Sequence, residues 1–459
     1  MNVLIVDNEL EYYDSFRRLV QSERPQDVVS CVGEALEAYE RLAAPTGPPF
    51  DLLVLDEEMG GGEHNGNALL RRLQEHPIRH EPAIIYITEF FDRLPVDPQS
   101  GRRVTLFLDK TSSSGDQLYR ALLLVARQKE GAPHCPADNF GSDFLDLVDS
   151  EVEESLVNVL QGYLTLNQQR SVASLIRSFV ATLRRRQTEW LADDVLEVAA
   201  FLAEGLCKVY GLPKQMVELV RRFYSVDEVL YTIPRYRDHF LHQLKVFLLG
   251  YCIVNRLNGR RRLEATVFAR PNGMKLWLMA SLFHDVGYPF EKIQTWIDNF
   301  ILGLLRSPAE ARDKDAPLVP IEFNWGALFA RRYHWYHMER IADLICSYYG
   351  QADAAQRASA RTNLLVALAT HVADQPDHGL FSALVLQNFL RMNVPDDEVD
   401  SAVVSVALHS RNVSSAVRDV IGRPLTFRED PLSFMLMFCD TAQEWGRSEA
   451  AIDDAKRTV

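Results

Sequence analysis

Residues 52–59 have the sequence LLVLDEEM, a continuous apolar run that ends in three acidic side chains. Similar short runs of aliphatic and β-branched residues occur at 2–6 (NVLIV), 83–88 (AIIYIT) and 104–108 (VTLFL), with amphipathic stretches of helical spacing between them. Strands buried on both faces have this composition, and their alternation with helices is typical of a parallel sheet. We therefore predict a doubly wound α/β domain with a parallel sheet over residues 1–130.

Polar side chains follow these predicted strands at the point where each strand ends. They are Asp7, Asn8 and Glu9, then Asp56 and Glu57, then Thr88, and finally Lys110. The carboxyl ends of parallel strands meet at one edge of a sheet, where ligands usually bind. Carboxylates at that edge predict a Mg²⁺ site, and a neighbouring lysine and hydroxyl can manage a phosphoryl group carried on a carboxylate.

The motifs around these residues resemble the four signatures of response-regulator receiver domains, in the correct order. They are IVDNE (5–9), LLVLDEEM (52–59), ITEF (87–90) and FLDK (107–110). HNGNALLRRL (64–73), which lies downstream of the second motif, resembles the glycine and the helix that follow it in this family. The resemblance implies that Asp56 accepts a phosphoryl group from a sensor histidine kinase or a phosphotransfer protein. It also implies that Lys110 pairs with the phosphoryl oxygens and that Thr88 turns toward them. The implied surroundings of Mg²⁺ are Asp7, Asn8, Glu9, Asp56 and the carbonyl group of Glu58.

Three positions depart from the receiver pattern. Asn8 replaces an acidic residue, which removes one formal charge and should weaken Mg²⁺ binding unless Glu9 compensates in part. Glycines 60–62 replace a proline, and Glu89 replaces a small residue. Two alternatives therefore stay open: a receiver that takes no phosphoryl group and serves for dimerisation or docking, and a doubly wound domain whose strand-end acids are merely solvated.

The composition changes after residue 130. GAPHCPADNFGSD (131–143) is a turn-rich break, and strand signals nearly vanish beyond it. We predict a linker and helical connector over 131–225 and an all-α domain over 226–459. Leu and Val recur in LVDSEVEESLVNVLQGYL (147–164), which is compatible with a homodimer seam or, as such stripes more commonly are, with core packing.

Histidine and aspartate lie inside very apolar segments of the helical half. His242 is in RDHFLHQLKVFLLG, three residues after His239; His284 and Asp285 end KLWLMASLF; Asp440 ends PLSFMLMFC. Buried imidazole and carboxylate groups are costly unless they pair or bind a metal. They are natural ligands of Zn²⁺, Mn²⁺ or Fe²⁺, whose bound water is a nucleophile near neutral pH.

The order of these residues resembles the HD superfamily of metal-dependent phosphohydrolases. The family pattern of a helix His, an adjacent His–Asp and a distant Asp matches His242, His284–Asp285 and Asp440, and DHGLFSALVL (377–386) and VALHS (406–410) also resemble family segments. The resemblance implies one or two divalent metals and hydrolysis of a phosphoester, with a nucleotide as the expected substrate. HDVGYP is not the HD-GYP signature, because the second motif of that group is absent, so cyclic di-GMP is not favoured.

Further histidines are candidates for a second metal or for phosphate contacts. They are His337, His371 and His378. His334, His337, His371 and His409 are each equally compatible with a ligand and with a packed, hydrogen-bonded imidazole. Arg447 can clamp a phosphate or instead pair with Glu444 at helical spacing.

Charge and composition argue against several classes of function. The chain has 459 residues with 63 acidic and 49 basic side chains, and its net charge of −14 argues against nucleic acid as the main partner. No stretch has 18 uninterrupted apolar residues, the start lacks a signal-peptide pattern, and the six cysteines form no CxxC pair. We expect a cytoplasmic response regulator whose receiver controls an HD-type phosphohydrolase. The alternative is an HD domain without catalysis that serves as a signalling or protein-interaction module.

Overall fold

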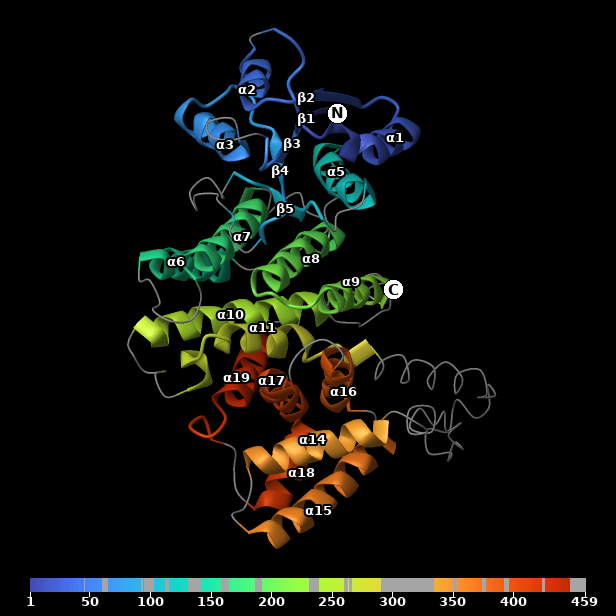
Figure 1. The fold of residues 1–459 in the computed structure, drawn as a ribbon, viewed down its shortest axis with the longest axis vertical. Helices are drawn as coiled ribbons and strands as arrows, with labels where there is room; N and C mark the ends of the chain where they lie inside the picture. The colour runs from blue at the N-terminus through green and yellow to red at the C-terminus, as the bar shows by residue number, and fades with distance from the viewer. Residues whose placement is uncertain are drawn as a thin grey trace, which may run out of the picture. The chain divides into compact units, whose positions relative to one another are not determined.

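The chain forms two compact units in a computed structural model (Figure 1). The first contains residues 1–221 and 255–260, and the second contains 222–254 and 261–459. The structure describes residues 1–44, 46–59, 65–91, 94, 103–111, 115–130, 142–157, 165–185, 192–230, 239–259, 263, 266–289, 334–349, 353–373, 377–391, 396–422 and 426–445.

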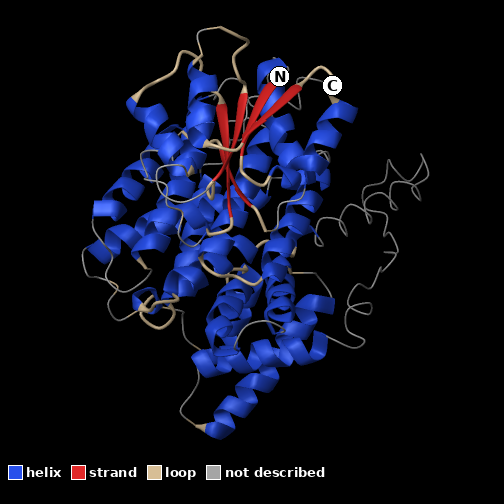
Figure 2. Ribbon diagram, turned by 45° about the horizontal axis from the view of Figure 1, so that its top comes forward, coloured by secondary structure: helices blue, strands red, loops and turns tan. Residues whose placement is uncertain are grey.

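The first unit contains a parallel sheet of five strands in the order β2-β1-β3-β4-β5 (Figure 2). The strands are β1 (Asn2–Val6), β2 (Val28–Val32), β3 (Leu52–Asp56), β4 (Ala83–Thr88) and β5 (Leu106–Asp109). The prediction of a parallel α/β domain is confirmed. The sequence pattern did not reveal β2, because this edge strand is half exposed and lacks the continuous apolar run of the inner strands.

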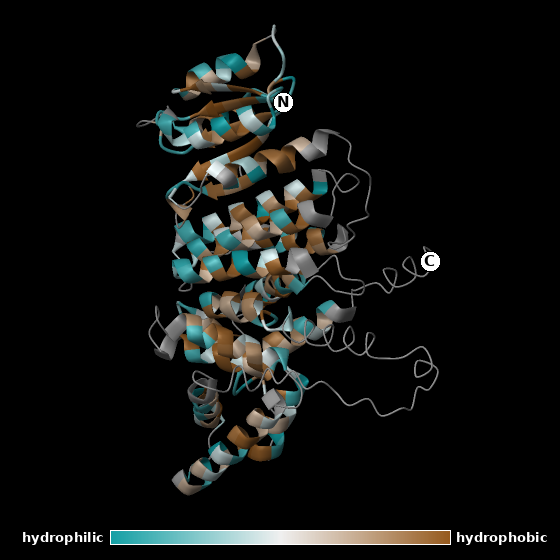
Figure 3. Ribbon diagram, turned by 90° about the vertical axis from the view of Figure 1, so that its right-hand side faces the viewer, coloured by the Kyte–Doolittle hydropathy of each residue, from teal (hydrophilic) through white to brown (hydrophobic). Residues whose placement is uncertain are grey.

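Helices cover both faces of the sheet, as a doubly wound arrangement requires. α1 packs with α5 on one face and α2 with α3 on the other (Figure 1). Their bounds, with the short helix η1, are η1 (Leu10–Tyr13), α1 (Asp14–Glu23), α2 (Ala35–Ala43), α3 (Gly66–Glu75) and α5 (Gly115–Glu130). Figure 3 shows the strands as mainly hydrophobic, while these helices carry hydrophilic residues on part of their surface. The order of strands is the one in which ligands bind beyond the carboxyl ends of β1 and β3.

Three helices of the predicted connector belong to the same unit as the sheet. They are α6 (Ser142–Val157), α7 (Leu166–Arg185) and α8 (Ala192–Val209), and α7 and α8 both contact β5. On α6, Val148 and Val152 of the predicted Leu and Val stripe are fully buried. This described part of the Leu and Val stripe therefore serves as core.

The described part of the second unit is helical, which confirms the change of class along the chain. Its elements, together with α9, which begins in the first unit, are α9 (Lys214–Leu230), α10 (His239–Gly259), η4 (Val267–Ala269), α11 (Gly273–Phe283), α14 (His334–Tyr348), α15 (Ala354–Ala373), α16 (His378–Arg391), α17 (Asp396–Leu408), α18 (Arg411–Ile421) and α19 (Pro431–Trp445). No helix among the described residues has the length and apolar character needed to cross a membrane.

A close crossing of α10 and α11 sets the relative position of His239 and His242 on α10 and of His284 and Asp285 just after α11. The Trp277 indole is fully buried, and its Nε1 donates to the carbonyl oxygen of Phe247 at 3.0 Å. A Cβ atom at Gly250 would lie only 2.0 Å from the ring atom Cζ2 of Trp277, so the absence of a side chain there allows the helices to approach. The crossing brings the histidines of α10 near the end of α11.

Gly66 has a similar role in the first unit. It begins α3 immediately beyond the strand-end acids, where Asn65 caps the helix by accepting a hydrogen bond from the backbone N–H of Ala68 at 3.0 Å. A Cβ atom at Gly66 would lie 2.3 Å from the carbonyl oxygen of Asp56. The start of α3 therefore packs against backbone that cannot move aside cheaply.

We expect Gly66→Ala to lower the free energy of unfolding of the full chain by about 1–3 kcal/mol, because the new methyl group overlaps a backbone carbonyl. Gly33→Ala is the matched control, since a Cβ atom there would meet nothing within 4 Å. The measurement is urea unfolding followed by circular dichroism. Equal effects of the two substitutions would show that α3 does not approach Asp56 as closely as described.

Candidate functional sites

The carboxyl end of the sheet gathers the predicted strand-end acids around one lysine. The Nζ atom of Lys110 lies 3.1 Å from Oδ2 of Asp7 and 3.2 Å from Oδ2 of Asp56. It also lies 3.2 Å from Oε2 of Glu9, whose side chain is 69% exposed. Asp7 and Asp56 are buried, so the ammonium group compensates charges that would otherwise be costly.

Two tyrosines complete this site, and the sequence analysis missed both. The hydroxyl of the buried Tyr13 donates to Oδ2 of Asp7 at 2.7 Å, and the backbone N–H of Glu9 donates to Oδ1 of Asp7 at 2.7 Å. Tyr12 donates to the carbonyl oxygen of Lys110 at 3.0 Å. These contacts depend on how η1 folds back after β1, which no motif in the sequence encodes.

Thr88 is buried at the end of β4 and is held by a neighbouring acid. Its hydroxyl donates to Oε2 of Glu57 and accepts from the backbone N–H of Phe90 at 3.0 Å. Asn8 and Glu58 are exposed. Groups of side chains that could share a metal ion occur, within the part of the chain that the structure describes, in the second unit. The Mg²⁺ site stays a prediction. In this structure the ammonium group of Lys110 contacts two of the predicted Mg²⁺ ligands, Asp7 and Asp56.

Burial shapes the electrostatics of Asp56. Loss of solvent and the nearby charge of Asp7 raise the pKa of Asp56 to about 6, although Lys110 opposes the shift. Burial disfavours the charge of Lys110, but Asp56 and Asp7 outweigh it and raise the lysine's pKa above its ordinary value. The site therefore holds a carboxylate whose charge is unusually costly and an ammonium group that stays charged.

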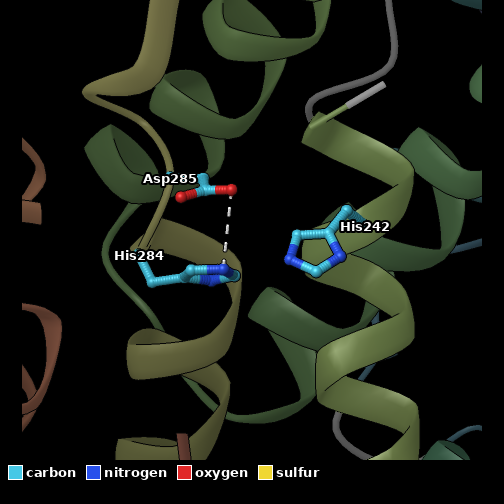
Figure 4. A group of neighbouring side chains, drawn as sticks. All are labelled: His242, His284 and Asp285. Atoms are coloured by element: carbon cyan, nitrogen blue, oxygen red, sulfur yellow. Dashed lines mark ion pairs between the residues drawn. The ribbon is translucent and has the colours of Figure 1, made fainter. Parts of the chain in front are cut away.

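A second cluster forms in the helical unit from residues far apart in the sequence. Figure 4 shows His242 on α10 facing His284 and Asp285, which directly follow α11. The Nε2 atom of His242 lies 2.8 Å from Oδ1 of Asp440 on α19. The Nε2 atom of His284 lies 3.6 Å from Oδ2 of Asp285 and 3.8 Å from Oδ1 of Asp440. The four residues predicted as the metal ligands thus converge.

Three further histidines surround Asp285. The Nδ1 atom of His239 lies 2.9 Å from its Oδ2 atom, whereas the Nε2 atoms of His409 and His378 lie 3.5 and 3.7 Å from its Oδ1 atom. His378 was a predicted candidate, His409 was open between ligand and packed imidazole, and the contact of His239 was missed. The spacing of His239 and His242 placed both on one helix face but gave no partner for the first.

Backbone carbonyls orient two of the rings. The Nδ1 atoms of His284 and His409 lie 2.8 and 2.6 Å from the carbonyl oxygens of Ser281 and Val406. A carbonyl only accepts, so each Nδ1 atom carries a proton, and in the neutral ring each Nε2 atom presents its lone pair. These buried Nε2 atoms make no hydrogen bond to the described residues. Such orphaned nitrogens, aimed at carboxylates, suit metal coordination.

The charges in the cluster are strongly coupled. Burial would raise the pKa of Asp285, but His284 and the hydrogen bond from His239 hold it well below the ordinary value. Burial also opposes a charge on His284, yet Asp285 and Asp440 raise that pKa. The pKa of Asp440 is likewise lowered, against burial, mainly by its contacts with His242 and His284. The carboxylates are therefore ionised and ready to accept a cation.

The donor set fits a divalent transition metal. Ligand atoms of three groups each lie within 4.8 Å of one another: His242, His284 and Asp285; His284, His409 and Asp440; Asp285, His378 and His409. Imidazole nitrogen and carboxylate oxygen are ligands of Zn²⁺, Mn²⁺ and Fe²⁺. His284, Asp285 and His409 each belong to two of these groups, so the cluster has donors for more than one ion. The buried position of Asp285 contrasts with the partly exposed side chains of Asp440 and His378, which are 25% and 28% exposed.

Gly287 explains how His378 reaches this cluster. A Cβ atom at Gly287 would lie 2.4 Å from the carbonyl oxygen of His378, and the backbone N–H of Gly287 donates to Oγ of Ser382 at 2.7 Å. The segment after Asp285 is therefore in direct contact with the first turn of α16. A larger residue at Gly287 would separate the two.

The remaining predicted residues lie outside the described side chains. These are His334, His337, His371, Glu444 and Arg447. Their assignment as ligands, phosphate contacts or packed residues stays a prediction.

Comparisons with known proteins leave the family unassigned. No family model matches the chain, and no curated protein matches it. One solved structure that the chain resembles is a fusion containing a yeast trimeric coiled-coil segment; it is 20% identical, covering 34% of this chain and 95% of that chain, with a TM-score of 0.23. A likeness at this TM-score carries no argument about fold or function.

The raised pKa of Asp56 predicts a pH-dependent effect of Asp56→Asn. The folded state holds the Asp56 proton more tightly than the unfolded state, so this group favours folding below pH 4 and that contribution is lost as the pH rises through 6. We expect Asp56→Asn to raise the free energy of unfolding at pH 7.5 by about 1–3 kcal/mol and to have little effect at pH 4. The measurement is urea unfolding of the full chain in the presence of a chelator.

The matched control is Asp14→Asn, because the Asp14 side chain is 58% exposed. Its effect should be small and the same at both pH values. A stability difference between wild type and Asp56→Asn that does not change with pH would contradict the assigned cost of ionising Asp56.

Proposed function

We propose that the second unit is an HD-type metal-dependent phosphohydrolase that acts on a phosphoester, in particular that of a nucleotide. The observation that carries the proposal is the convergence of four residues named by the sequence motif: ligand atoms of His242, His284 and Asp285 lie within 4.8 Å of one another, and Asp440 lies beside both histidines. Packed apolar residues would fill such a position at lower cost, because burying this many imidazoles and carboxylates is expensive without a cation.

The chemistry that a metal supplies there is a nucleophilic hydroxide at neutral pH and polarisation of a phosphoryl oxygen. His242, His284, Asp285 and Asp440 would hold one ion. His378 and His409, with Asp285 between the two groups, would hold a second. His242 donates its Nε2 proton to Asp440, so coordination of a metal by this nitrogen would require that the proton leave.

The residues around the ligands have distinct roles. His239 donates its Nδ1 proton to Asp285 and so keeps that carboxylate oriented. The ring of Tyr288 stacks on His239 with centroids 3.4 Å apart and also meets the edge of His378. Because Asp440 and His378 are the partly exposed members of the set, a substrate would approach the metals past them.

We also propose that the first unit is a receiver that controls this activity through phosphorylation of Asp56. Asp56 is buried at the end of β3 with the ammonium group of Lys110 at 3.2 Å, and Thr88 is buried at the end of the neighbouring strand β4. A phosphoryl group from a histidine kinase or phosphotransfer protein would add charge that Lys110 can pair with and that Thr88 can approach by leaving Glu57. Mg²⁺ held by Asp7 and Asp56 would accompany the transfer.

The first experiment is metal content by mass spectrometry, on protein equilibrated anaerobically with Mn²⁺, Fe²⁺ and Zn²⁺ and then desalted. We expect one or two tightly held metals per chain, and hydrolysis of at least one member of a panel of nucleotides and cyclic nucleotides. His284→Ala/Asp285→Ala should lose the metal and reduce hydrolysis by about 100-fold or more. Asp440→Asn is a milder second variant, and His80→Ala, at an exposed histidine, is the control.

Single variants separate the two proposed ions. His242→Ala should remove one metal and His409→Ala the other, because they belong to different groups of ligands. Equal metal content in wild type and the His284/Asp285 double variant would refute the metal site. Tight metal without hydrolysis of any phosphoester would favour a signalling or interaction module instead.

Phosphorylation is measured separately, by incubating the full chain with an acyl phosphate and Mg²⁺ and resolving the product on a phosphate-affinity gel. We expect one phosphoryl group per chain in wild type and none in Asp56→Asn. Hydrolytic activity should change by severalfold when the group is present. Incorporation that persists in Asp56→Asn would exclude Asp56 as the acceptor.

A further inference from the structure

The strand β5, which leads to Lys110, is packed against helices from later in the chain. Ser178 on α7 donates to the carbonyl oxygen of Val104 at 2.7 Å, and Thr182 donates to that of Thr105 at 3.1 Å. Ser171 on the same helix accepts from the backbone N–H of Leu94 at 2.8 Å. Both the start of β5 and the segment after β4 are thus fixed to α7.

Lys208 on α8 makes a more consequential contact with the same region. Its Nζ atom lies 2.7 Å from Oδ2 of Asp109, and the two side chains are 16% and 10% exposed. Asp109 directly precedes Lys110, and its Oδ1 atom accepts from the backbone N–H of Thr111 at 2.8 Å. The backbone on either side of Lys110 is therefore held by a carboxylate that α8 anchors.

The same ammonium group contacts the segment that follows Thr88. Nζ of Lys208 lies 5.1 Å from the centroid of the Phe91 ring, a distance typical of a cation–π contact. A Cβ atom at Gly205, one turn earlier on α8, would lie 3.2 Å from Cε1 of Phe91, so the ring packs directly on this helix. Lys208 therefore contacts Asp109, which directly precedes Lys110, and Phe91, which lies three residues after Thr88.

We infer that Lys208 is a positioning residue of the Asp56 site, and that through it α8 responds to the charge at Asp56. Lys110 moves toward or away from Asp56 as that charge changes, which shifts Asp109, while release of Thr88 from Glu57 shifts Phe91. Both movements act on Lys208. The coupling free energy is the same in both directions, so a change in α8 alters the Asp56 site by the same free energy as the charge at Asp56 alters α8.

The inference rests on the proposed function only in its choice of Asp56 as the site whose charge changes. α8 is in turn bonded to α9, because Arg221 donates to both carboxylate oxygens of Glu204 at 2.7 Å. Arg221 is the residue at which the first unit ends within the continuous helix α9. A change in α8 thus reaches, by direct contacts, the segment that continues into the second unit.

The test is a double-mutant cycle on the full chain, followed by hydrogen exchange of the peptides that cover α8. Asp56→Asn removes the charge, and Lys208→Met removes the ammonium group while keeping the length of the side chain. We expect Asp56→Asn alone to change the opening equilibrium of α8 by about fivefold, and the change to vanish in the Lys208→Met background. Lys208→Gln is a second neutral variant in case Lys208→Met fails to fold.

Two controls separate positioning from general loosening. Lys208→Arg keeps a cation that can pair with Asp109, so it should restore the response of α8 to Asp56→Asn. Lys214→Met removes an exposed lysine at the start of α9 and should leave the wild-type response. An α8 response of the same size with and without the Lys208 charge, or no response in wild type, would overturn the inference.

Treatment with an acyl phosphate distinguishes this inference from the proposed function. If the coupling is present but no phosphoryl group is incorporated, Lys208 is a positioning residue and Asp56 is not a phosphoryl acceptor. If Asp56 is phosphorylated but hydrogen exchange of α8 does not change, Asp56 is the phosphoryl acceptor and the inferred coupling to α8 is wrong.

Discussion

The helical unit depends on how the buried charge of Asp285 is compensated. Its side chain is 8% exposed, and removing a carboxylate from water to that extent costs several kcal/mol unless partners surround it. His239 and His284 lie beside one oxygen, and His378 and His409 lie near the other. These partners come from α10, the end of α11, α16 and the end of α17, so compensation of one charge constrains the packing of four segments.

At the carboxyl end of the sheet in the first unit, buried charges are also compensated, but the central group there is a cation. There the buried group at the middle is the cation of Lys110, and the surrounding groups are carboxylates. Tyr13 donates to Oδ2 of Asp7, the same oxygen that Lys110 contacts, so Asp7 has two partners, while burial and the charge of Asp7 keep the pKa of Asp56 raised. An added phosphoryl group or a divalent cation would change that balance of charge.

The sequence predicted the parallel sheet and the four converging histidine and aspartate residues because both depend on local pattern. Continuous apolar runs identify inner strands, and polar residues that end such runs must gather where the runs end. β2 was missed because an edge strand need not be apolar throughout. The choice among the additional histidines depends on helix packing: Gly287 meets α16, and a Cβ atom at Gly379 would lie 3.0 Å from Cε1 of His409. No spacing rule in the sequence encodes those approaches, nor the contact of Lys208 with Asp109.

The hydroxyls of α7 have a consequence for assembly. β5 is the outer strand of the sheet on its side, and an uncovered outer strand can pair with a strand of another molecule. Ser178 and Thr182 occupy the carbonyl oxygens that lead into β5, so an incoming strand would first have to displace α7. At the opposite margin, Val28 of β2 is 56% exposed. Misassembly by strand addition would therefore begin at β2, and partial unfolding that detaches α7 would open a second route to aggregation.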